Sequence, residues 1–170
     1  MKTRRLRYNR VSKAFTLAEV LLASSILSIT IAALSQTISG GQAQTSQALH
    51  ELRAISLAEA LMEEVLSMPY DDPEAELTVG PDAGESTRSD FDNADDFHGY
   101  TESAGNTVDE AGVAYPALYD EFSRSVAAAY SVVNVTEFGG NVDGLSVTVT
   151  VTDTKGAAWY VTRFLPEPTE

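Results

Sequence analysis

The chain has 170 residues, no cysteine and a formal net charge of -14, with 25 acidic residues against 11 basic ones. The absence of cysteine excludes disulfides, thiolate metal sites and cysteine nucleophiles. The charge is unevenly distributed, because six of the basic residues lie in the first fourteen positions, which leaves 5 basic against 25 acidic residues, a net -20, in the remainder. Such a surface repels nucleic acid and anionic lipid, so we expect no nucleic-acid partner.

Residues 1–14 form a basic leader, and an apolar segment follows it. Residues 15–34 contain a single charged residue, Glu19, among Leu, Ile, Val, Ala, Ser and Thr. A helix of about twenty residues spans roughly 30 Å, which is the thickness of the hydrocarbon core of a bilayer. We therefore predict one membrane-spanning helix over 15–38, with its basic end in the cytoplasm and the rest of the chain outside.

Residues 39–69 continue the helical pattern but with one apolar face. Apolar residues recur at spacings of three to five, which predicts an amphipathic helix; they are Leu49, Leu52, Leu57, Leu61, Val65 and Met68. Pro69 ends this helix. Gly40 and Gly41 weaken it, since glycine costs about 1 kcal/mol in a helix relative to alanine. Two interpretations stay open: a simple weak point at the membrane boundary, or a hinge used when the helix enters a filament.

Residues 70–123 are acidic and rich in Gly, Pro, Ser and Asn, which predicts a long loop region with short elements. Residues 124–170 predict an antiparallel sheet, with strands at 124–135, 145–153 and 157–165. The middle strand alternates valine with threonine, as a half-buried strand does. The predicted fold class is α+β: a long N-terminal α-helix, membrane-spanning in its first half and amphipathic in its second, packed on a small antiparallel β-sheet.

The stretch "FTLAEVLLASSIL", from Phe15 to Leu27, directly follows the basic leader. It resembles the N-terminus of type IV prepilins and of the pseudopilins of type II secretion. The resemblance implies that a membrane aspartyl peptidase cuts between Ala14 and Phe15, and that the new N-terminus of Phe15 is methylated. It also implies that Glu19 is the family's fifth-position glutamate. The chain departs from the family pattern at Ala14, where glycine is usual, and at Ala18, where a larger aliphatic residue is common.

Glu19 is also the residue whose position most needs a physical explanation, because a charge at membrane depth costs several kcal/mol unless it is paired. Cleavage after Ala14 creates an α-amino group on Phe15, one helical turn from Glu19. Pairing of the carboxylate with this amine, or with that of a neighbouring subunit, neutralises both charges and would set the axial register of a filament. The plainer interpretation is a polar residue of a signal anchor that snorkels to the interface.

A conventional secretory signal, cut near residues 32–36, is the rival interpretation of the N-terminus. The charge of Glu19 inside the apolar stretch argues against it, as does the helical pattern that continues past the cut.

Four aspartates lie within seven residues and are candidate calcium ligands: Asp90, Asp92, Asp95 and Asp96. The resemblance also makes calcium a candidate ligand, because calcium orders loops in some pseudopilins. The order of residues does not fit an EF-hand, because Ala94 stands at the fifth position when Asp90 is the first. A solvated acidic loop without a bound ion is the alternative. Three aromatic residues are expected to hold this loop against the sheet: Phe91, Phe97 and Tyr100.

The sequence contains no pattern typical of a catalytic site. His50 and His98 are too far apart to suggest a shared site, and we expect His50 at the surface or at a groove edge. Neither a Gly-x-Ser-x-Gly elbow nor a Walker-type loop occurs. Trp159 and Tyr160 are expected to serve core and edge packing. We therefore predict no catalytic residue, no enzymatic activity and no cofactor apart from possible Ca²⁺.

The resemblance implies a minor pilin or pseudopilin, a structural subunit of a type IV pilus or of a type II secretion pseudopilus. Its partners would be the prepilin peptidase, the inner-membrane assembly platform and other pilin subunits that contact its N-terminal helix. It would be a single-pass protein of the bacterial inner membrane, with a cytoplasmic N-terminus and a periplasmic or extracellular C-terminal domain. Two alternatives are a membrane-anchored ligand-binding or adhesion module outside any filament, and a membrane-anchored hydrolase.

Overall fold

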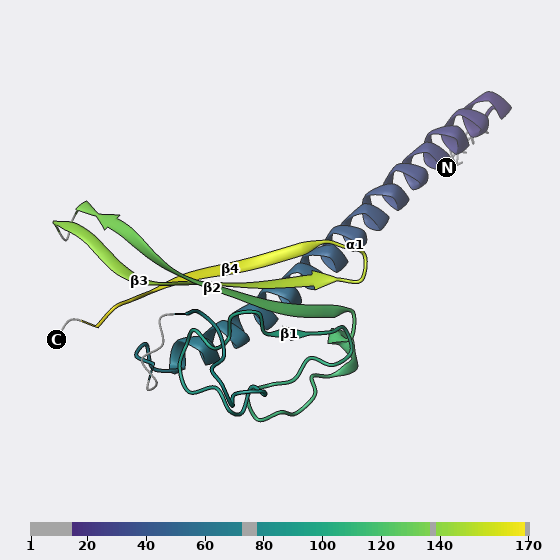
Figure 1. Cartoon of the computed structure of the whole chain (residues 1–170). Helices are drawn as coiled ribbons and strands as arrows, with labels where there is room; N and C mark the ends of the chain where they lie inside the picture. Colours follow the sequence, from purple (N-terminus) through teal and green to yellow (C-terminus); the bar gives the residue numbers. More distant parts are fainter. Residues whose placement is uncertain (1–14, 73–77, 137–138, 169–170) are drawn as a thin grey trace, which may run out of the picture. The chain divides into compact units, whose positions relative to one another are not determined.

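The computed structural model describes residues 15–72, 78–136 and 139–168. Its elements, in chain order, are α1 (Leu17–Ser67), β1 (Thr101–Glu102), the 3-10 helix η1 (Ala117–Tyr119), β2 (Phe122–Val135), β3 (Gly140–Asp153) and β4 (Ala158–Pro166) (Figure 1). The chain divides into two units, Met1–Ser46 and Gln47–Glu170, and α1 contributes to both. One long helix with part of its length packed on an antiparallel sheet confirms the predicted α+β class.

Helix α1 runs without interruption through Gly40 and Gly41. It ends at Ser67, two residues before Pro69, where the sequence predicted its end. Pro69 explains this boundary, because proline has no N–H to donate to the helix and disfavours helical dihedrals in the residue before it. The backbone N–H of Met68 closes the final turn by donating to the Val65 carbonyl at 3.2 Å.

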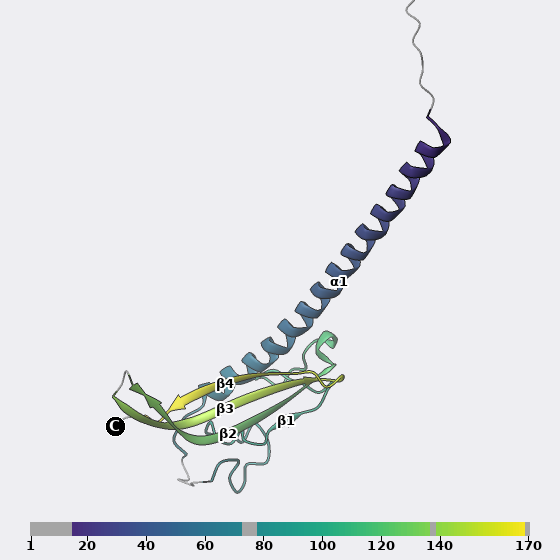
Figure 2. The ribbon, with the colours of Figure 1, turned by 90° about the horizontal axis from the view of Figure 1, so that it is seen from above.

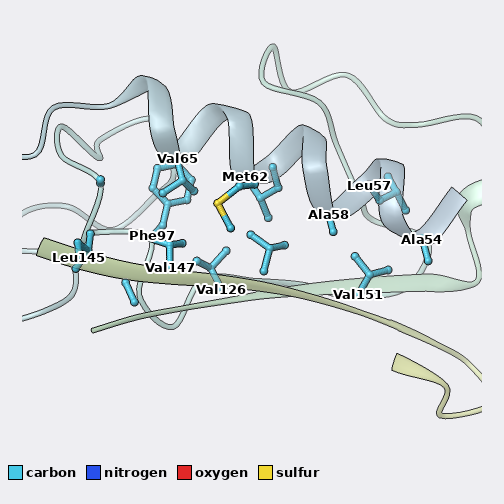
Figure 3. Packing of buried hydrophobic residues seen from close by; sticks show 14 of the residues in the cluster. Ala54, Leu57, Ala58, Met62, Val65, Phe97, Val126, Leu145, Val147 and Val151 are labelled. Atoms are coloured by element: carbon cyan, nitrogen blue, oxygen red, sulfur yellow. The ribbon is translucent and has the colours of Figure 1, made fainter. Parts of the chain in front are cut away.

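In the C-terminal unit, one face of α1 packs on the sheet (Figure 3). Its buried apolar residues are Ala54, Leu57, Ala58, Leu61, Met62 and Val65. The predicted apolar stripe is wrong at its start, because Leu49 and Leu52 are 49% and 59% exposed. The buried face begins instead at Ala54 and includes Ala58. The small side chains of these two residues let the helix backbone approach the strands closely.

The sheet is antiparallel, with the strands in the order β1-β2-β3-β4 (Figure 2). Strands β2 and β3 pair along their whole length, from Phe122 opposite Asp153 to Val135 opposite Gly140. In β3 the valines of the predicted alternation are buried against the helix, and the threonines between them are partly exposed. This confirms the half-buried strand.

Strand β3 begins at Gly140, five residues before the predicted start at Leu145. The sequence "GNVDG" there consists largely of turn residues, but pairing with β2 outweighs that local preference. Gly144 is required sterically, because a Cβ at this position would collide with the Leu165 carbonyl and with Pro166 on β4. The predicted loop region 70–123 contains β1 and η1, in keeping with short elements.

Aromatic residues hold the acidic loop against the core, as predicted. Phe97 is fully buried, and its ring lies 5.1 Å from that of Phe91 and 5.9 Å from that of Tyr100. The backbone is fixed as well, because Gly99 N–H donates to the Val126 carbonyl and Val126 N–H donates to the Tyr100 carbonyl, both at 3.0 Å.

Candidate functional site

The first candidate site is the apolar part of α1 in the N-terminal unit. All large apolar side chains from Phe15 to Ile38 are exposed, with exposed fractions between 54% and 83%. The most apolar window of α1 has a mean hydropathy of 2.1, and none of it is buried within the molecule. In the described part of the chain, α1 is the one helix long and apolar enough to cross a membrane.

Most of the hydroxyl groups in this part of α1 bond back to carbonyl groups of the same helix. Ser24 and Ser25 both donate to the Leu21 carbonyl, at 2.9 Å and 2.8 Å, and Thr30 donates to the Ile26 carbonyl at 2.8 Å. A hydroxyl that bonds back to its own helix requires no water. The serine and threonine content of this segment is therefore compatible with an apolar environment.

Glu19 lies in the first turn of α1 and forms a capping box with Thr16. The Thr16 backbone N–H and hydroxyl donate to the Glu19 Oε2 at 2.8 Å and 3.0 Å, while the Glu19 N–H donates to the Thr16 Oγ1 at 3.2 Å. These bonds satisfy backbone donors that the first turn of a helix leaves free. Sequence reasoning missed Thr16, although a threonine three residues before a glutamate is the signature of this box. Ala14, on the other side of the predicted cleavage site, lies outside the described residues.

Two of the four candidate calcium ligands have hydrogen-bond partners outside the acidic cluster, one nearby in sequence and one distant. Asp90 accepts hydrogen bonds from the hydroxyl and the N–H of Thr87, at 2.7 Å and 2.9 Å, and these bonds lower the pKa of its carboxyl. Asp95 is buried and accepts a hydrogen bond from the Tyr130 hydroxyl at 2.8 Å. Burial raises the pKa of Asp95, and the bond from Tyr130 partly offsets this effect.

The structure brings the other two candidates, Asp92 and Asp96, together with Glu85. One carboxylate oxygen from each of the three residues lies within 4.8 Å of the others, a spacing that could hold a metal ion. Asp96 is 1% exposed and accepts hydrogen bonds from the N–H groups of Asp92 and Asn93, both at 3.0 Å. Burial raises the pKa of Glu85, and the charges of Asp96 and Asp92 raise it further. Oxygen ligands of this kind suit Ca²⁺.

A buried network of ion pairs ties the acidic loop to α1 and to β2. Arg88 Nε donates to the Glu64 Oε1 at 2.5 Å, and Arg88 Nη1 lies 3.1 Å from the Glu102 Oε1. Arg124, which is 2% exposed, donates from Nε to the Glu102 Oε2 at 2.6 Å and from Nη1 to the Leu57 carbonyl at 3.3 Å. The charges of the two arginines and two glutamates balance, so burial leaves none of these four unpaired.

A cavity of about 530 Å³ adjoins this network and is lined in part by Glu64, Arg88, Phe91 and Tyr100. Arg88 is already paired with Glu64 and Glu102, so its role in the wall is structural. Sequence reasoning did not find the network, because its charged partners come from three different segments of the chain.

His50 lies between two carboxylates and against two aromatic rings. Its Nε2 is 2.9 Å from the Asp153 Oδ2, and its Nδ1 is 3.2 Å from the Glu121 Oε1. The ring centroid lies 4.7 Å from that of Phe122 and 5.4 Å from that of Trp159. The His50 side chain is 21% exposed, so the groove-edge position that we expected is the better of the two descriptions.

These features define a class of protein. It is an α+β domain whose long helix α1 also provides an exposed apolar N-terminal segment. No protein-family model, curated protein or solved structure matches the chain. The function is therefore inferred from the residues themselves.

Proposed function

We propose that this chain is a minor pilin or pseudopilin, a non-enzymatic subunit that is cut by the prepilin peptidase and assembled into a type IV pilus or a type II secretion pseudopilus. The observation that carries the proposal is the carboxylate of Glu19 in the first turn of an exposed apolar helix, four residues after Phe15. The basic leader before Ala14 supports the same conclusion.

The energetics of assembly follow from the two surroundings that α1 would occupy. In a bilayer its apolar side chains contact lipid, and in a filament they contact the helices of neighbouring subunits, so neither state exposes them to water. Glu19 bonds to Thr16 within its own helix. On assembly the carboxylate would accept a hydrogen bond from the α-ammonium group of a neighbouring subunit. Glu19 would then have a polar partner in both states.

Mass spectrometry of the N-terminal peptide, from protein purified out of native membranes, tests the processing step. A peptide that begins at Phe15 and carries an added methyl group supports the proposal. A mature N-terminus near Gln36 indicates a conventionally exported domain instead. An intact leader indicates a plain signal anchor, and either of these last two results overturns the proposal.

The substitution Glu19→Ala tests the assembly step. We expect normal cleavage of the leader and a loss of about tenfold or more in incorporation into sheared filaments, because the substitution removes the charged partner of a neighbour's ammonium group. Glu51→Ala, at an exposed glutamate of the same helix, is the matched control and should assemble normally. Equal incorporation of both variants would favour the anchored ligand-binding or adhesion module, for which Glu19 has no role.

A further inference from the structure

His50 lies where α1 first meets the sheet. Every residue of α1 before it is exposed, and buried positions begin four residues later at Ala54. The imidazole lies against Phe122 at the start of β2 and against Trp159 on β4. A change in the contacts of His50 therefore acts on the first attachment of the docked helix, ahead of its first buried residue at Ala54.

Both ring nitrogens of His50 face carboxylate oxygens, Nε2 facing Asp153 and Nδ1 facing Glu121. An ionised carboxylate can only accept hydrogen bonds, so both contacts are hydrogen bonds only when both ring nitrogens carry protons. A neutral imidazole has one N–H, and the lone pair of its other nitrogen would then face a carboxylate oxygen. The observed geometry therefore suits the imidazolium form.

We propose that His50 is a proton-operated clasp between α1 and the sheet, closed when the imidazole is charged and opened at Glu121 when it loses a proton. An imidazole is the side chain whose charge ordinarily changes between about pH 5 and 8. Binding of a proton to His50 would thus control the attachment of the first docked turns of α1 to the sheet. This inference concerns the C-terminal unit alone and does not depend on the proposed filament function.

The contact with Glu121 is the one that opens, because the contact with Asp153 is the better supported of the two. The Asp153 side chain is 4% exposed, and its other carboxylate oxygen accepts hydrogen bonds from the N–H groups of Lys155 and Ala157, both at 2.9 Å. The hydrogen bond from His50 lowers the pKa of Asp153. Glu121 is 38% exposed and lies at the longer distance, so water can replace His50 as its partner.

The charged residues next to His50, in sequence or in space, come from α1, from the segment before β2, and from β3 with the turn after it. On α1 the flanking charged residues are Glu51 and Arg53, and the segment before β2 carries Asp120 and Glu121. Strand β3 supplies Asp153, the turn after it carries Lys155, and β4 contributes the uncharged Trp159. Of these residues, Glu121 and Asp153 are the two whose carboxylates contact the imidazole.

His98 provides an internal contrast. Its Nδ1 accepts a hydrogen bond from the Ala128 N–H at 3.1 Å, which requires that this nitrogen carry no proton. The two histidines of the chain therefore have opposite requirements, and both can be followed by NMR in the same sample.

Hydrogen exchange on the full chain in detergent micelles tests the clasp, with Glu121→Gln as the decisive variant. The side-chain amide that this substitution introduces can accept from a protonated Nδ1 or donate to an unprotonated one, so the contact survives loss of the proton. Between about pH 5.5 and pH 8, we expect protection at residues 49–53, measured relative to 58–67, to fall roughly fivefold in the wild type. Protection should stay constant in Glu121→Gln. Glu59→Gln, at an exposed glutamate of the same helix, should behave as the wild type does.

NMR of the histidine ring nitrogens in the wild type provides a second measurement that needs no variant. We expect two protonated nitrogens on His50 at about pH 5.5 and one at about pH 8, with Nε2 keeping its proton toward Asp153. A His50 ring that is already neutral at the lower pH overturns the clasp. So does a loss of protection in Glu121→Gln that equals the loss in the wild type.

Discussion

Glu85 is the residue at which burial and charge repulsion act in the same direction. Its carboxyl lies in the cluster with Asp92 and Asp96, and burial together with these neighbouring charges raises its pKa. A carboxyl whose pKa is higher in the folded state binds its proton more tightly there than in the unfolded chain. The stability that this group contributes is therefore present at low pH and is lost as the pH rises through its folded pKa.

The substitution Glu85→Gln should remove this pH dependence. Between about pH 4 and pH 7, we expect the free energy of unfolding of the wild type to fall relative to that of Glu85→Gln, because the glutamine cannot ionise. Chemical denaturation at a series of pH values measures the difference. Asp90→Asn is the contrasting variant, because the bonds from Thr87 lower the pKa of Asp90 and the stability that it contributes is lost as the pH falls rather than as it rises.

Calcium provides a second readout of the same cluster. If Glu85, Asp92 and Asp96 hold the ion, added Ca²⁺ should stabilise the wild type at neutral pH and stabilise Glu85→Gln less, because binding to the folded state alone shifts the unfolding equilibrium. The first prediction is wrong if the free energy of unfolding changes with pH in the same way in the wild type and in Glu85→Gln, because the pKa of Glu85 would then be the same in the folded and unfolded chain. Equal responses to Ca²⁺ would show that this cluster is not the site.

At the scale of the element, α1 shows what glycine does in a long helix. Gly40 and Gly41 are helical, and a Cβ added at either position would meet nothing within 4 Å apart from the helix's own nearby backbone. The two glycines are therefore not required by packing within the chain. Their effect is on the intrinsic stability of the helix, because glycine loses more backbone freedom than alanine does when the helix forms.

Replacing both glycines, Gly40→Ala with Gly41→Ala, should stabilise this part of α1 by about 1 kcal/mol per residue. Circular dichroism of the full chain in detergent, followed with temperature, measures the gain, and Ala43→Gly should have the opposite effect. Incorporation into filaments then separates the two interpretations of the pair. A hinge predicts reduced incorporation despite the more stable helix, whereas a simple weak point predicts no change.

At the scale of the whole molecule, the distribution of charge sets the expected orientation. Six of the eleven basic residues lie on the N-terminal side of the apolar stretch, and most of the acidic residues follow it. Lysine and arginine close to a membrane-spanning helix are retained on the cytoplasmic side. We therefore expect the C-terminal unit, which carries all the acidic residues except Glu19, to lie outside the cytoplasm.

The lack of native cysteine allows a direct test of this orientation. In cells with a permeable outer membrane, Lys155→Cys in the exposed turn after β3 should react with a membrane-impermeant maleimide. Ala23→Cys, within the apolar part of α1, should react only after detergent is added, because lipid or neighbouring helices cover it. Labelling of Lys155→Cys only after the inner membrane is broken would reverse the proposed orientation.

The features that could be predicted from the sequence rest on local periodicity. The apolar run from Phe15 and the valine alternation in β3 are both patterns of neighbouring residues, so they are visible without knowing which distant segments pack together. Together they predicted the α+β class. Pro69 likewise marked the end of α1 to within two residues, because its effect on the backbone is confined to its neighbours.

Tertiary structure decided which distant segments meet. It turned the buried face of α1 toward Ala54 and Ala58 rather than Leu49, and it extended β3 back to Gly140 through pairing with β2. It also joined residues far apart in the sequence, such as Arg124 with Glu102, 22 positions away, and His50 with Asp153, 103 positions away. A hydrogen bond or ion pair depends on the separation of two atoms in space, and spacing along the chain does not determine that separation once the chain folds back on itself.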